Sequence, residues 1–123
     1  MKTLIKNGYI INENVIFESD ILVNGEFIEK IEKTISSDDV DRVVDCKGSL
    51  ILPGIIDDQV HFREPGYPNK ATIFSESRAA VAGGVTSYFE MPNTNPSTTT
   101  IESLNSKFNI ASKSSLANYS FMF

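Results

Sequence analysis

The residues with the clearest chemical potential lie between Pro53 and Gly66, in the run PGIIDDQVHFREPG. An apolar segment there leads into carboxylates, an amide, the only histidine of the chain and a guanidinium. The residues that supply them are Asp57, Asp58, Gln59, His61, Arg63 and Glu64. Zinc binds imidazole nitrogen and carboxylate oxygen, and guanidinium pairs with carboxylates. These residue types therefore suit a metal site, an anion site or both.

A β-strand over residues 55–62 would bring four of these side chains together. Side chains alternate between the two faces of a strand. One face would then carry Asp57, Gln59, His61 and Arg63. The alternate residues are mostly apolar, with Asp58 as a predicted surface charge. A buried strand that ends in polar groups is how an α/β barrel displays catalytic side chains at the carboxyl ends of its strands.

The whole chain is predicted to contain two regions of different architecture. Residues 1–52 hold short β-prone runs between turn residues, and Asn24-Gly25 is the strongest hairpin signal among them. The strands predicted there are 3–6, 9–11, 20–23, 26–31, 42–45 and 49–52. From residue 53 the pattern alternates: strands at 55–62, 85–91 and from 118, with helices over 70–82 and 99–113. This order predicts a small all-β domain followed by an α/β domain with a parallel sheet.

The two predicted helices have recognisable signals at their ends. Gly83-Gly84 ends the first, and Thr99 with Glu102 forms a capping box that opens the second. The apolar stripes expected to be buried are Ile73, Phe74, Ser77 and Val81 in the first helix and Leu104, Phe108 and Ala111 in the second.

Composition excludes some classes of function. The formal net charge of -5 leaves no electrostatic footprint for nucleic acid. The single cysteine, Cys46, cannot form an internal disulfide, which fits a reducing compartment. No signal-like N-terminus or span of about 20 apolar residues is present. We expect a cytoplasmic protein without a membrane or nucleic-acid partner.

Three motifs carry a resemblance to a known family. The strand at 55–62 resembles the first barrel strand of the amidohydrolase superfamily, and specifically the dihydroorotase pattern D-x-H-x-H-F-R-E-P-G. The runs AAVAGGVTS at 79–87 and MPNTNP at 91–96 also resemble dihydroorotases. The resemblance implies the start of a (β/α)8 TIM-type barrel over residues 53–123, preceded at 1–52 by part of a composite β-sandwich domain. A barrel needs roughly 250 residues, and the 123 residues stop within the β-prone run NYSFMF. We therefore expect an N-terminal piece of a longer protein.

The resemblance also implies an activity and roles for residues. Dihydroorotases reversibly hydrolyse the cyclic amide of dihydroorotate to N-carbamoyl-aspartate in de novo pyrimidine biosynthesis. His61 would bind zinc in a site of one or two ions. On the strand, Asp57 shares the face of His61, and from there it would orient the imidazole. Arg63 and Asn93 would hold the substrate carboxylate. The general-base aspartate and the other metal ligands are expected beyond residue 123, so these residues alone are expected to be inactive. Whether the protein forms a homodimer is left open by the sequence.

Gln59 departs from the family pattern, because it stands where the first histidine is expected. An amide oxygen is a weaker zinc ligand than imidazole. The site would then bind a single metal ion tightly, bind a second metal ion loosely, or belong to a protein that has lost catalysis. The alternatives are a non-catalytic scaffold subunit, an allantoinase or hydantoinase, and a free-standing binding module. From the residues alone, Asn93 could equally be a turn residue and Arg63 could pair with Glu64 or Glu76.

Overall fold

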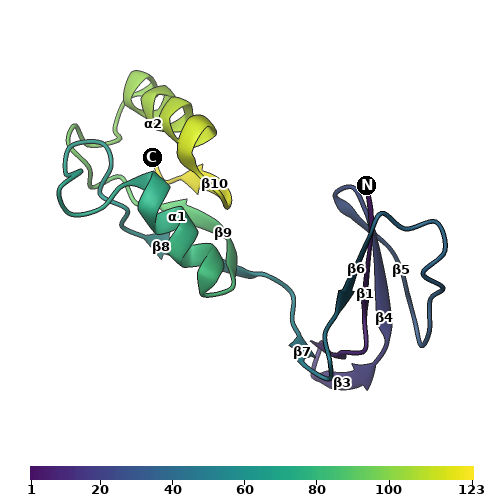
Figure 1. Ribbon diagram of the computed structural model, residues 1–123. Helices are drawn as coiled ribbons and strands as arrows, with labels where there is room; N and C mark the ends of the chain where they lie inside the picture. The colour runs from purple at the N-terminus through teal and green to yellow at the C-terminus, as the bar shows by residue number, and fades with distance from the viewer. The chain divides into compact units, whose positions relative to one another are not determined.

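The computed structural model describes all residues from 1 to 123 and divides them into two compact units, Met1–Pro53 and Gly54–Phe123. The first unit contains strands β1 (Lys2–Lys6), β2 (Tyr9–Asn12), β3 (Val15–Glu18), β4 (Asp20–Asn24), β5 (Phe27–Glu32), β6 (Arg42–Asp45) and β7 (Leu50–Ile51). The second contains β8 (Ile55–Val60), α1 (Ile73–Ala82), β9 (Val85–Glu90), α2 (Ile101–Ser114) and β10 (Asn118–Phe121) (Figure 1). Neither helix has the length and apolar character needed to cross a membrane.

The first unit is built from two small sheets, ordered β5-β4-β1-β6 and β3-β2-β7. The predicted β4–β5 hairpin is present, with Gly25 at a φ of 60° in its turn. Strand β3 was not predicted, although Glu13 and Asn14 form its turn from β2 at φ values of 49° and 63°. Asparagine tolerates this left-handed conformation better than most residues. The buried apolar cluster of this unit comprises Leu4, Leu22 and Ile35.

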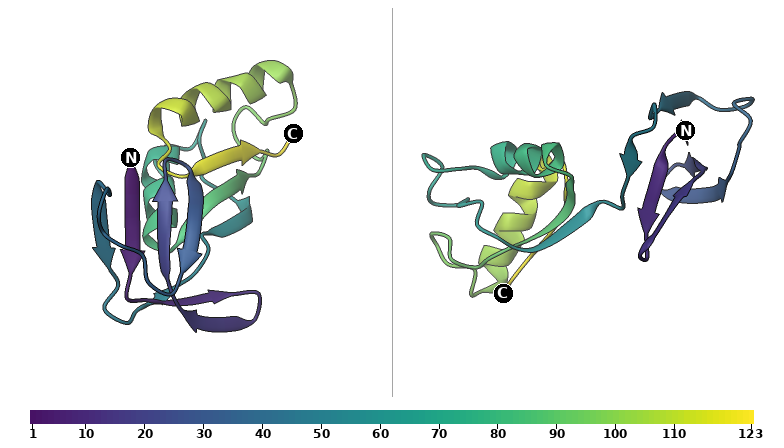
Figure 2. Two further views of the ribbon diagram at one scale, coloured as in Figure 1. Left: turned by 90° about the vertical axis from the view of Figure 1, so that its right-hand side faces the viewer. Right: turned by 90° about the horizontal axis from the view of Figure 1, so that it is seen from below.

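The second unit is a parallel sheet in the order β10-β9-β8, with both helices on one of its faces (Figures 1 and 2). Tyr88 of β9 and Phe121 of β10 are buried in one cluster with Ile73 of α1 and Ala111 of α2. Apolar residues on the opposite face, among them Ile56 and Phe89, line an open hollow. The predicted strand–helix order and parallel pairing are confirmed, and the chain is a mixed α/β protein.

The predicted apolar stripes are only partly correct. In α1, Ile73 and Ser77 are buried, but Phe74 is 55% exposed. The guanidinium of Arg78 lies 3.6 Å from the centre of the Phe74 ring and stacks on this exposed side chain. In α2 the buried residues are Ala111 and, unexpectedly, Lys107.

Both helices begin later than predicted, because hydroxyl groups cap them. Helix α1 starts after Thr72, and α2 starts after Thr100, one residue beyond the expected Thr99. The Thr100 hydroxyl accepts a hydrogen bond from the Ser103 N–H at 3.2 Å, and Ser103 Oγ accepts from the Thr100 N–H at 3.1 Å. This reciprocal pair satisfies two N–H groups that the helix itself leaves free.

Thr100→Ala should lower the free energy of unfolding by about 1 kcal/mol, because it removes the side chain that caps α2. Thr99→Ala is the matched control, since the neighbouring threonine does not cap the helix, and it should change stability by less than about 0.5 kcal/mol. Urea unfolding followed by circular dichroism at the helical band reports the second unit, which holds both helices. Equal losses in the two variants would contradict the observed cap.

Candidate functional site

The carboxyl ends of the three parallel strands meet at one edge of the sheet. The Met91 N–H, just after β9, donates to the Val60 carbonyl at the end of β8 at 3.0 Å. The Met122 N–H, just after β10, donates to the Glu90 carbonyl at 2.9 Å. Polar residues that follow β8 and β9 therefore emerge side by side. This is the edge at which parallel α/β proteins bind their ligands.

His61 and Asn93 meet at this edge from different strands. Nδ1 of His61 lies 2.9 Å from Oδ1 of Asn93, and both residues are exposed. An amide oxygen can only accept a hydrogen bond, so the imidazole donates from Nδ1. The lone pair of Nε2 is then free to bind a metal ion. Sequence reasoning named both residues, and the structure brings them into contact.

Arg63 follows His61 by two residues and has a free guanidinium. Its backbone has a φ of 67°, and its side chain makes no hydrogen bond or ion pair within the chain. The carboxylates that could have neutralised it are engaged elsewhere. Glu64 accepts the Ile73 N–H at 2.7 Å, and Glu76 accepts the Ser75 hydroxyl at 2.9 Å. The guanidinium is therefore available to an anionic ligand.

The loop that carries Arg63 packs against the loop that carries Asn93. The Asn95 N–H donates to the Pro65 carbonyl at 3.1 Å. Gly66 has a φ of 102°, and a Cβ added there would overlap the Asn95 carbonyl oxygen. Only glycine allows this approach. The close contact holds the two loops, and hence the two predicted substrate residues, at one place.

Gly66→Ala should separate these loops and destabilise the second unit by about 2–4 kcal/mol, the sum of backbone strain and overlap. Gly84→Ala is the matched control, because Gly84 also has a positive φ of 92° but nothing lies within 4 Å of an added Cβ. The control should lose only the stability that backbone strain costs, about 1 kcal/mol. Urea unfolding compares the two variants, and equal losses would mean that the loop contact contributes nothing.

Strand β8 is shorter than predicted and does not alternate regularly. It ends at Val60, and its register against β9 shifts between Asp57 and Val60. An extra residue in one strand interrupts alternation, so the regular alternation from Asp57 to Arg63 on which the predicted common face rested is not observed. Asp57 Oδ1 accepts the Gln59 N–H at 3.1 Å and shapes this irregular segment. The structure thus gives Asp57 a bond to Gln59 in place of the predicted contact with His61.

Few of the residues at this edge can act as metal ligands. No group of three or more His, Cys, Asp or Glu residues lies close enough to hold a metal ion. His61 offers one free imidazole nitrogen, and the exposed Gln59 offers an amide oxygen. Zinc takes three or four protein ligands. The donors present suit zinc but are fewer than this number.

Sequence reasoning missed a buried ion pair beside this edge. Lys107 Nζ contacts Glu90 Oε2, and the two side chains are 1% and 0% exposed. Burial raises the pKa of the Glu90 carboxyl, and the Lys107 ammonium opposes that shift, with smaller help from His61 and the Phe62 N–H. Lys107 follows Leu104 by three residues and precedes Ala111 by four, so it lies in the predicted buried stripe of the helix. This position was the available sign that Lys107 is buried.

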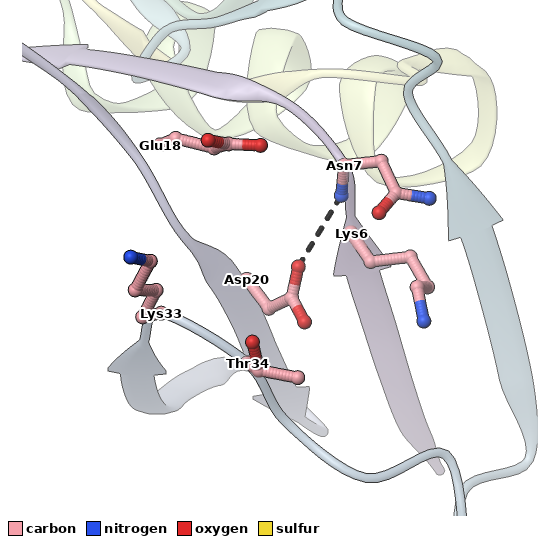
Figure 3. Close-up of a pocket in the computed structure, with 6 residues that line it drawn as sticks. All are labelled: Lys6, Asn7, Glu18, Asp20, Lys33 and Thr34. Carbon is pink, nitrogen blue, oxygen red and sulfur yellow. Dashed lines mark hydrogen bonds between the residues drawn. The ribbon is translucent and has the colours of Figure 1, made fainter.

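A hollow in the first unit surrounds another buried carboxylate, that of Asp20 (Figure 3). Asp20 is 5% exposed, and its two oxygens accept the N–H groups of Asn7 at 3.2 Å and Ile35 at 3.0 Å. Lys6, Lys33, Glu18 and Thr34 complete the lining. Both carboxylate oxygens are used to tie two loops to β4, so we assign Asp20 a structural role.

Solved structures that match this chain include two hydantoinases. The L-hydantoinase (dihydropyrimidinase) from Arthrobacter aurescens matches 97% of this chain and 27% of its own, with a TM-score of 0.91 and 28% identity. The D-hydantoinase (dihydropyrimidinase) from Thermus sp. matches 98% of this chain and 27% of its own, with a TM-score of 0.82 and 31% identity. The fold of this chain is thus that of the matching part of these two hydantoinases.

Sequence comparison narrows this class to one family. The family model described as dihydro-orotase-like matches residues 48–121, and the chain belongs to that family. The dihydroorotase of Enterococcus faecalis is 43% identical over 114 residues, which are 92% of this chain and 27% of that protein. The dihydroorotase of Bacillus subtilis is 48% identical over 97 residues, 78% of this chain and 22% of that protein. The predicted resemblance is confirmed, and the chain spans about a quarter of the length of these relatives.

Proposed function

We propose that this chain is part of a dihydroorotase, which hydrolyses the cyclic amide of dihydroorotate to N-carbamoyl-aspartate and catalyses the reverse reaction. The observation that carries the proposal is the unpaired guanidinium of Arg63 two residues from the His61–Asn93 pair. Dihydroorotate bears a carboxylate on the same ring as the amide that reacts. A guanidinium binds a carboxylate through two parallel hydrogen bonds. The neutral rings of hydantoins have no such group for Arg63.

The architecture supports the same proposal. Residues 53–123 would form the first βα units of a (β/α)8 barrel, and residues 1–52 would be part of the small β domain. A barrel wall is a parallel sheet whose helices all cover its outer face. The sheet β10-β9-β8 has this arrangement, with α1 and α2 on one face and apolar residues exposed on the other.

The residues of this chain would bind and orient the substrate. Arg63 would hold the substrate carboxylate. Asn93 uses Oδ1 for His61, which leaves its Nδ2 hydrogens free to donate to the same carboxylate. The docked loops at Gly66 and Asn95 would set the distance between the two residues. The substrate amide would thereby be fixed near Nε2 of His61, and a substrate fixed in this way reacts faster than a free one.

His61 would be the chain's main ligand to zinc through Nε2, with Gln59 as a weak ligand beside it. Bound zinc supplies Lewis acidity, which polarises a carbonyl and lowers the pKa of bound water toward about 7. The Asn93 hydrogen bond to Nδ1 keeps the metal-binding nitrogen deprotonated. The aspartate that acts as general base would come from residues outside this chain.

Gln59→His tests this proposal in the full-length protein that carries the chain. An imidazole at position 59 should bind zinc more strongly than an amide oxygen, so zinc should survive a higher chelator concentration while dihydroorotate turnover holds or rises. Asp58→His, at an exposed neighbouring position, is the control and should change neither value. Unchanged zinc retention in Gln59→His would remove Gln59 from the metal site.

A scaffold subunit without catalysis is the second candidate, and Gln59 is the feature that favours it. A scaffold would neither retain zinc nor turn over dihydroorotate, whether residue 59 is Gln or His. The same experiment therefore separates the two functions.

A further inference from the structure

The buried Glu90–Lys107 pair adjoins the strand ends from which His61 and Asn93 emerge. Glu90 is the last residue of β9, and Lys107 reaches it from α2. Apart from Lys107, the carboxylate oxygens of Glu90 have no hydrogen bond of good geometry. An apolar pair of similar volume often stabilises a protein as well as a buried ion pair does. Stability alone therefore gives little reason for two charges at this place.

The Lys107 ammonium makes a second bond that an apolar side chain could not make. Nζ donates to the Met91 carbonyl at 3.0 Å. Met91 is the first residue after β9, and its N–H already donates to the Val60 carbonyl, one residue before His61. The Met91 backbone is thus held by α2 through its carbonyl and by β8 through its N–H. Asn93 lies two residues after Met91 on this fixed backbone.

The orientation of Asn93 determines the state of the His61 imidazole. Oδ1 of Asn93 accepts from Nδ1, so the proton stays on Nδ1 and Nε2 stays free. Because both side chains are exposed, water competes for this bond whenever Asn93 moves. The Met91 N–H bond to the Val60 carbonyl holds the start of the Met91–Asn93 segment against β8 and so keeps Asn93 near His61.

We propose that Glu90 and Lys107 are positioning residues, which hold the Met91 backbone so that Asn93 keeps the His61 imidazole in its Nδ1-protonated tautomer. Glu90 holds the ammonium, the ammonium holds the Met91 carbonyl, and this backbone aims Asn93 at His61. The consequence for catalysis rests on the proposed function. The effect on the tautomer does not, and it can be measured without substrate or metal.

The test uses the fact that His61 is the only histidine of the 123 residues. Long-range ¹H–¹⁵N spectra of the chain, in a buffer alkaline enough to keep the imidazole neutral, then report one ring. The unmodified chain should show mainly the Nδ1-protonated tautomer. Asn93→Ala, which removes the acceptor, should show the Nε2-rich mixture of a free imidazole and so defines the other limit.

Lys107→Met should shift the His61 signals most of the way toward the Asn93→Ala limit, and Glu90→Gln should shift them part of the way. The double variant Glu90→Met/Lys107→Met covers the case in which a single variant fails to fold, because it leaves no unpaired buried charge. It also lacks the bond to the Met91 carbonyl, so the same shift is expected. Lys113→Met, on the exposed side of α2, is the control and should leave the tautomer unchanged.

A folded Lys107→Met or double-methionine variant with the unmodified tautomer would overturn the proposal. Enzyme kinetics in the full-length protein add a second readout. Lost positioning should raise KM for dihydroorotate several-fold in the double variant, and Lys107→Arg should restore part of the loss. A merely structural role would lower the folded fraction, and with it the apparent kcat, at unchanged KM. If the unmodified full-length protein did not turn over dihydroorotate at all, the proposed function would be contradicted, and the tautomer result would still stand.

Discussion

Replacing Lys107 with methionine should lower the free energy of unfolding of the second unit by about 3–5 kcal/mol. The reason is that the change leaves Glu90 as an uncompensated charge inside the protein. Both side chains of the pair are at most 1% exposed, so solvent cannot take over the role of the ammonium. A loss of this size is a large part of the stability of an ordinary domain. Urea unfolding at neutral pH, followed by circular dichroism at the helical band, measures it.

The matched variants identify the cause. Lys113→Met removes an exposed lysine from the same helix and should change stability by less than about 0.5 kcal/mol. The double variant Glu90→Met/Lys107→Met removes both charges and should recover most of the loss. If the double variant were as unstable as Lys107→Met, the damage would come from packing and not from the unpaired carboxylate.

The loss in Lys107→Met should also depend on pH. Burial raises the pKa of Glu90, and Lys107 is the main group that opposes this. Without Lys107 the folded-state pKa rises further above its unfolded value. Stability linked to a raised pKa is present below the unfolded value and is lost as the pH rises through the folded one. The variant should therefore be least unstable in acid and lose stability toward neutral pH, whereas Lys113→Met should follow the unmodified chain.

The sequence predicted the elements better than their details. The order of strands and helices from residue 53 was readable because Gly, Pro and capping residues separate the periodic runs. The irregular register of β8 could not be predicted. The hydrogen bond from the Gln59 N–H to the Asp57 carboxylate shapes it, but in the sequence Asp57 and Gln59 look like ordinary strand residues. Strand β3 was missed because its residues, Val15–Glu18, are all exposed and lack an alternating pattern.

The site was predictable where motifs marked it. His61, Arg63 and Asn93 were named from the runs that contain them, and the contact of His61 with Asn93 follows from adjacent parallel strands. The Glu90–Lys107 pair lies outside those motifs. A charged residue in an apolar stripe is usually taken to reach solvent, and only the packing of α2 on β9 shows that Lys107 meets a carboxylate. Sequence pattern alone does not contain this information, because the two partners belong to different elements, β9 and α2.

Arg63→Ala should lower kcat/KM for dihydroorotate by roughly a hundredfold, equivalent to about 3 kcal/mol, in the full-length protein. The loss should appear mainly in KM, because the guanidinium binds the carboxylate of the substrate and takes no part in bond making. The kcat/KM of Arg63→Lys should lie between those of Arg63→Ala and the unmodified protein, since an ammonium binds as a point charge and loses the paired geometry. Arg42→Ala removes an exposed arginine from the first unit and should have no effect.

A substrate without the carboxylate shows whether Arg63 acts through that group. Dihydrouracil has the same ring amide as dihydroorotate but no carboxylate, so any slow turnover of it should be equal in Arg63→Ala and the unmodified protein. Zinc content should also be equal, because the free guanidinium of Arg63 is not a ligand. A similar loss with both substrates would mean that Arg63 shapes the loop, which its φ of 67° and the Tyr67 N–H bond to its carbonyl at 3.0 Å would then explain. A loss confined to dihydroorotate would assign the carboxylate to Arg63 and favour the dihydroorotase over the hydantoinase.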